Sequence, residues 1–115
     1  MVSDLTDLFV THTELPLFII SESERNPQNL YEAVDFHSFE AVVRKELAAL
    51  IETQTIREIT FPDFISHLIG MIIYPFIGRH MLSHLSGIQG EAWVEMLESR
   101  KTLIPETMTQ YLYKK

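Results

Sequence analysis

The sequence predicts an all-α protein in which residues 1–115 form one domain, a five-helix bundle. Two observations support this fold class. Apolar residues recur at helical spacing through most of the chain, and the one strand-like segment, Leu17–Ile20, runs directly into the helix-favouring stretch Ser21–Arg25. Prolines and glycines divide the chain into five helical pieces, with breaks near Pro16, Pro27, Pro62 and Gly87–Gly90.

The first three predicted helices are amphipathic. The first, Ser3–Thr13, is expected to be capped by Ser3 and to carry its apolar side chains on one face. Pro16 lies in the first turn of the second helix, where its missing N–H costs no hydrogen bond. Asn26 is expected to cap a long third helix, whose pattern is compatible with a kink near residues 35–38. The polar segment Gln54–Thr60 is predicted to be a connector.

The fourth predicted helix, Phe61–Leu85, is apolar on every face. Such a helix must be buried on every side, and a chain of 115 residues has few other elements with which to surround it. Its longest apolar run, Leu68–Ile77, falls well short of the ~20 residues that a bilayer requires. We therefore expect no membrane span. One side of the helix should pack within the domain and the other against a second copy of the chain, which predicts a homodimer.

The fifth predicted helix is Glu91–Tyr113. Pro75 in the fourth helix and Pro105 in the fifth lie inside helical patterns, where a proline removes one hydrogen bond and bends the helix. The apolar period resumes in phase after each proline, so both helices are predicted to be continuous. Because the connections are short, sequential helices are expected to pack as near-antiparallel neighbours.

Composition excludes several classes of function. The net charge is −7, with nine basic residues scattered along the chain, which argues against direct binding to DNA phosphates. There is no cysteine, so neither a disulfide nor a thiolate site is available. The N-terminus lacks the basic and apolar regions of a signal peptide, and a cytoplasmic location is expected.

The order of these signals resembles the C-terminal ligand-binding and dimerisation domain of TetR-family transcriptional regulators. The resemblance covers essentially the whole chain. It rests on the stretch ELPLFIISE at Glu14–Glu22, on Asn26-Pro27, on the pattern FxxxLxGMIxYPxI at Phe64–Ile77, and on MLESRK at Met96–Lys101 followed by Ile104-Pro105. No segment corresponds to the family's N-terminal helix-turn-helix domain. The chain is therefore expected to be a truncated, excised or standalone effector domain, with DNA contacted only through that missing domain.

The resemblance implies two sets of functional residues and no cofactor. The last two helices of each subunit would form an intersubunit four-helix bundle, whose interface residues would be Ile73, Ile77, Met81, Trp93, Leu97, Ile104, Met108 and Tyr111. A pocket for a small hydrophobic ligand would lie among the first, third and fourth helices. Its lining would be Phe9, Phe36, Phe39, Val43, His67, Met71 and Tyr74. Ligand binding would then alter the spacing of the DNA-binding domains of a repressor.

Other interpretations remain open at this point. Each pocket candidate also fits an ordinary core position. His80 and His84 share one helix face, but a pair without a third ligand is weak evidence for a metal, so no metal site is predicted. No catalytic motif is present, and an enzyme is not expected. The alternative function is a standalone helical-bundle interaction module that binds no small molecule and engages another protein through its last two helices.

Overall fold

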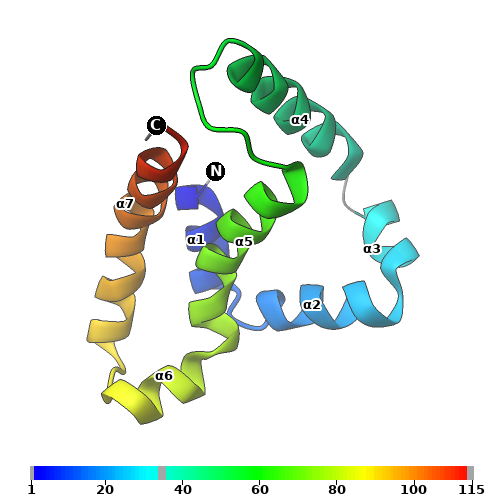
Figure 1. Ribbon diagram of the computed structural model, residues 1–115. Helices are drawn as coiled ribbons and strands as arrows, with labels where there is room; N and C mark the ends of the chain where they lie inside the picture. The colour runs from blue at the N-terminus through cyan, green and yellow to red at the C-terminus, as the bar shows by residue number, and fades with distance from the viewer. Residues whose placement is uncertain (1, 34–35, 114–115) are drawn as a thin grey trace.

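The computed structural model describes residues 2–33 and 36–113, and in these ranges all regular secondary structure is α-helical (Figure 1). Seven helices follow one another. They are α1 (Val2–Thr11), α2 (Leu15–Arg25), α3 (Pro27–Ala33), α4 (Phe36–Glu52), α5 (Phe61–Ile77), α6 (Arg79–Ser86) and α7 (Glu91–Tyr113). The all-α prediction is confirmed. The expected fourth helix forms two helices, α5 and α6, and the expected third helix is described as α3 and α4 on either side of residues 34–35.

The core lies among α1, α5 and α7, which run side by side (Figure 1). Its buried apolar side chains come from all three helices: Phe9, Leu68, Ile72, Ile73, Ile104 and Met108. Ile104 is only 1 % exposed. Helix α5 also contacts α2 and α6, so it is the central helix of the fold. This position explains why its sequence is apolar on nearly every face.

A series of aromatic side chains connects the helices at the end of the core next to α6. The Phe9 and Phe76 rings meet edge to face at 5.4 Å, and Phe76 meets Trp93 in the same way at 6.0 Å. The Arg79 guanidinium lies 4.7 Å from the centre of the Trp93 ring. Edge-to-face contacts and cation–π stacking are favourable geometries for these groups, and here they join α1, α5, α6 and α7.

Because of Pro75, one backbone carbonyl of α5 lacks its usual hydrogen-bond donor. A side chain of α7 supplies the donor instead. Proline has no N–H, so the carbonyl of Met71, four residues earlier, receives no helical hydrogen bond from position 75. The Arg100 side chain donates from Nη2 to this carbonyl oxygen at 2.6 Å. Burial lowers the pKa of Arg100 below its ordinary value. Its Nε is buried and finds no hydrogen-bond partner among the described residues. The bond to Met71 therefore fixes α7 to the middle of α5.

The sharp change of direction after α5 occurs at Gly78, three residues beyond Pro75. Helix α5 continues through Pro75 to Ile77, and α6 leaves at an angle of 71°. A Cβ at position 78 would lie 2.8 Å from two carbons of the Tyr74 ring. The Tyr74 ring covers this glycine and its hydroxyl donates to the Met81 sulfur at 3.6 Å. The predicted continuous helix Phe61–Leu85 is therefore wrong, and the break lies where only glycine leaves room for the ring.

Helices α2, α3 and α4 form an arm that leaves the core and returns to it through the connector (Figure 1). Helix α4 packs extensively against none of the other described helices. It is held near α5 by Arg44, whose guanidinium lies 4.4 Å from the centre of the Phe61 ring. The connector folds back onto the end of α4, and its Ile56 is buried. The expected kink near residues 35–38 falls partly on residues 34–35, outside the described ranges.

Among the described residues, no single helix combines the length and hydrophobicity needed to cross a bilayer; α5 and α6 reach both only as a bent pair.

A double-mutant cycle should reveal the compensation between Pro75 and Arg100. Arg100→Met leaves the Met71 carbonyl without a donor and should lower the free energy of unfolding by about 1–3 kcal/mol. In a Pro75→Ala background, the new N–H at position 75 can donate to Met71, so the same Arg100→Met change should cost much less. Urea unfolding of the four proteins measures both costs, and equal costs in the two backgrounds would contradict the compensation.

Lys101 should make stability depend on alkaline pH. Its Nζ donates to Asp7 at 2.6 Å and to Glu98 at 3.0 Å, and these bonds raise the pKa of Lys101 above its ordinary 10.5. The stabilisation is complete below that ordinary value and is lost as pH rises through the raised pKa of the folded state. The urea midpoint of the wild type should therefore fall more steeply in this range than that of Lys101→Met. Lys45→Met, which removes an exposed lysine from α4, should behave like the wild type.

Candidate functional site

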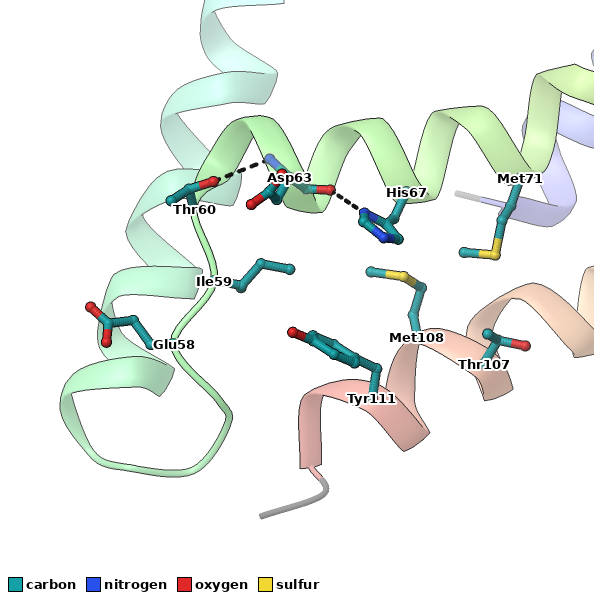
Figure 2. Close-up of a pocket in the computed structure, with 9 residues that line it drawn as sticks. All are labelled: Glu58, Ile59, Thr60, Asp63, His67, Met71, Thr107, Met108 and Tyr111. Atoms are coloured by element: carbon teal, nitrogen blue, oxygen red, sulfur yellow. Dashed lines mark hydrogen bonds between the residues drawn. The ribbon is translucent and has the colours of Figure 1, made fainter.

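A pocket lies at one end of the α5–α7 pair, where the connector crosses it. Its volume is about 470 Å³, within the usual range for small-molecule sites. Figure 2 shows side chains from three segments around this space. The connector contributes Glu58, Ile59 and Thr60, α5 contributes Asp63, His67 and Met71, and α7 contributes Thr107, Met108 and Tyr111.

Local sequence signals position the α5 side of the pocket. Thr60 has extended backbone and caps α5, because its Oγ1 accepts a hydrogen bond from the Asp63 N–H at 3.2 Å. Pro62 in the first turn lacks only an N–H that would have no helical partner. Both features agree with the predicted start of this helix. They place Asp63 at the pocket edge and His67 one turn further along.

The His67 ring has a defined tautomer. Its Nδ1 lies 2.8 Å from the backbone oxygen of Asp63, and a carbonyl oxygen can only accept, so Nδ1 carries the hydrogen. The other ring nitrogen, Nε2, is then an acceptor in the neutral imidazole. Figure 2 shows the ring directed toward Met108 and the interior of the pocket. His67 thus presents an apolar ring face and one acceptor.

On the side of the pocket opposite His67, the connector contacts the end of α7 and the Tyr111 ring. The Arg57 N–H donates to the carbonyl of Leu112 at 2.8 Å. The Arg57 guanidinium lies 4.7 Å from the centre of the Tyr111 ring. These contacts hold the connector against the end of α7 and keep Ile59 over the pocket. The sulfur atoms of Met71 and Met108 line the inner side (Figure 2), and methionine adapts to ligands of irregular shape.

Of the seven predicted ligand-binding residues, His67 and Met71 meet in this pocket. Phe9 is buried in the core at 4 % exposure. Phe39 and Val43 lie on α4, Tyr74 lies over Gly78 further along α5, and the Phe36 side chain falls outside the described part of the structure. The pocket is formed by α5 and α7, whereas the prediction placed it among the first, third and fourth helices. The role of all seven residues in binding stays a prediction.

The predicted dimer residues fall into two groups. Five are buried within the single chain, namely Ile73, Trp93, Leu97, Ile104 and Met108. Ile77, Met81 and Tyr111 are exposed by 44 %, 59 % and 47 %, so these three are free to meet a second copy. Tyr111 and Met108 also line the pocket.

Sequence reasoning missed the connector as part of the site. Ile56 and Ile59 are the only apolar residues of the otherwise polar stretch 53–60. These two isoleucines are the signal that this segment folds back onto the helices. No group of three or more His, Asp or Glu side chains comes together as a metal site within residues 2–33 and 36–113.

No protein-family model matches the chain, and no curated protein or solved structure matches it. The resemblance to TetR-family effector domains therefore stays a prediction from the residue pattern.

The cap at Thr60 should be measurable as a local contribution to stability. Thr60→Ala removes the acceptor for the Asp63 N–H and should lower the free energy of unfolding by about 1 kcal/mol. Thr60→Asp retains a capping oxygen and should keep most of the wild-type value. Urea unfolding followed by circular dichroism makes the comparison, and equal losses in both variants would show that the hydrogen bond is not the cause.

Proposed function

We propose that this chain is the ligand-sensing and homodimerising domain of a TetR-like transcriptional repressor. The observation that carries the proposal is the chain's large exposed surface. Its accessible area is 8144 Å², whereas a compact monomer of this mass exposes about 6,500 Å². The radius of gyration is 15.8 Å, against about 13 Å for a compact domain of this length. The large exposed area and the extended shape support the proposal that the chain belongs to a larger assembly.

An apolar stripe on α5 and α6 supports a second copy of the chain as the partner. The stripe consists of Tyr74, Ile77, Met81 and Leu85, and each of these side chains is at least 44 % exposed. They follow one another at intervals of three or four residues across the bend at Gly78. A standard interface buries about 800 Å² per partner. The excess area of the monomer is roughly twice that, so a standard dimer interface would account for about half of the excess.

The pocket and the stripe lie toward opposite ends of α5. Asp63 and Ile77 are separated by fourteen residues of one helix, which corresponds to about 21 Å. A ligand that draws the connector toward α7 would favour one arrangement of α5 and α7, and α5 would carry that preference to the interface. This is a population shift of the kind required to change the spacing of attached DNA-binding domains. The Arg100–Met71 bond lies between the two ends and joins the same helices.

Sedimentation equilibrium of the purified chain is the direct test of this proposal. A tight dimer that is stabilised by apolar ligands in a thermal-shift screen supports it. A monomer at micromolar concentration that no ligand stabilises would overturn it and favour an interaction module for a different protein.

Met81→Glu should identify the interface. A carboxylate at a twofold interface faces its own copy or a desolvated apolar surface, so the dimer dissociation constant should rise about 100-fold. Val42→Glu on α4 is the matched control, because Val42 and Met81 are almost equally exposed, at 58 % and 59 %. The control should remain as dimeric as the wild type. Equal weakening by both substitutions would move the interface away from the stripe.

A further inference from the structure

We propose that the pocket between the connector, α5 and α7 binds a neutral molecule that carries one hydroxyl group on a compact apolar body, such as an aryl alcohol. This inference rests on the proposed ligand-sensing function and specifies the class of ligand. It follows from the position of the charged groups, from the polar groups of the lining and from the apolar side chains between them, considered in turn.

The charged groups around the pocket lie at its edge. The Glu58 side chain is directed away from the other lining residues (Figure 2), and Glu58 and Asp63 are both exposed. On the side opposite His67, the Arg57 guanidinium lies 4.7 Å from the centre of the Tyr111 ring. Groups of both signs therefore border the pocket and give it no strong preference for an anion or a cation. A charged ligand would have to give up hydration to enter the apolar interior, so a neutral ligand is favoured.

His67 supplies a hydrogen-bond acceptor that faces the interior. Its Nδ1 hydrogen is used on the Asp63 backbone oxygen, 2.8 Å away, so Nε2 of the neutral ring can only accept. Figure 2 shows the ring directed toward Met108. Among the described residues, none donates a hydrogen bond to Nε2. A ligand hydroxyl group can donate this bond and remain neutral.

Two hydroxyl groups of the lining can satisfy the lone pairs of a ligand oxygen. Thr60 Oγ1 accepts from the Asp63 N–H at 3.2 Å, and its own hydrogen remains able to donate. The Tyr111 hydroxyl can donate or accept. A ligand hydroxyl, which also does both, matches this mixture. An ammonium group has no lone pair for these donors, and an ether or a ketone has no hydrogen for Nε2.

The side chains between these polar groups suit an apolar body. Ile59, Met71 and Met108 line the inner part of the pocket (Figure 2), and the pocket volume is about 470 Å³. Methionine side chains adapt to irregular shapes, and their sulfur atoms make favourable contacts with the edges of aromatic rings. An aromatic ring on a short alkyl chain therefore fits this lining.

Two probes that differ at one end group test the hydroxyl assignment: phenylbutanol and its methyl ether. Isothermal titration calorimetry of the full chain should show the alcohol binding about fivefold more tightly, since one hydrogen bond makes a modest net contribution. The ether carries an extra methyl group, so apolar contact favours the ether and cannot produce this preference. Phenylbutylamine and phenylbutyrate have the same body with a charged end, and both should bind more weakly than the alcohol.

Substitutions at His67 locate the effect. His67→Phe keeps a ring but removes the acceptor, so it should weaken binding of the alcohol about fivefold and leave binding of the ether nearly unchanged. His67→Gln retains an acceptor oxygen and should recover part of the loss. His37→Phe is the matched control, because His37 is also an exposed helical histidine, on α4, and does not line the pocket. Thermal unfolding of the three variants verifies that they remain folded.

Each outcome bears on a different claim. Equal or tighter binding of the ether, the amine or the butyrate would overturn the hydroxyl ligand while leaving the ligand-sensing function in place. An alcohol preference that persists in His67→Phe, or a loss that His37→Phe shares, would overturn the assignment to His67. No binding of any probe by a chain that sediments as a dimer would also overturn the hydroxyl ligand. A monomer that binds none of them would overturn the proposed function itself.

Discussion

The hydrogen bond between Arg100 and the Met71 carbonyl is the contact on which the arrangement of α5 and α7 depends. It exists because Pro75 cannot donate to that carbonyl, so the central helix has an acceptor in its middle turn that a neighbour must satisfy. A partly buried guanidinium is costly to place, and the buried Nε of Arg100 has no hydrogen-bond partner among the described residues. The link therefore specifies one register between the two helices more strongly than apolar packing alone, which tolerates sliding.

Once this register is set, the two ends of α5 acquire different roles. At one end, the Thr60 cap and the connector bring Asp63, His67 and Tyr111 around a pocket. At the other end, Gly78 turns the chain and leaves the stripe of Tyr74, Ile77, Met81 and Leu85 exposed. One helix thus joins the pocket to the exposed apolar stripe. This is the layout that a sensor domain needs if binding is to change association.

The features that follow from local signals could be predicted, and those that depend on packing could not. Pro62, two residues after Thr60, marked the start of α5, and the last helix was predicted with the bounds Glu91–Tyr113 that the structure has. The break at Gly78 was missed because the apolar period continues across it, and its cause is the Tyr74 ring lying over the glycine. His67 and Met71 were named as pocket residues because the family resemblance implied them. Their neighbours Ile59, Thr107 and Tyr111 depend on how the connector and α7 pack, which the helical period does not contain.

The loosely attached arm divides the molecule into two cooperative units. The α1, α5 and α7 core shares one buried cluster, whereas α4 relies on Arg44, the connector and its own hydrogen bonds. Segments with few tertiary contacts open with a smaller free energy than the core. We therefore expect backbone amides of α4 to exchange with solvent through local opening, and those of α5 to exchange only when the whole core unfolds. The connector joins both units, so a ligand in the pocket would be expected to change how often the arm opens.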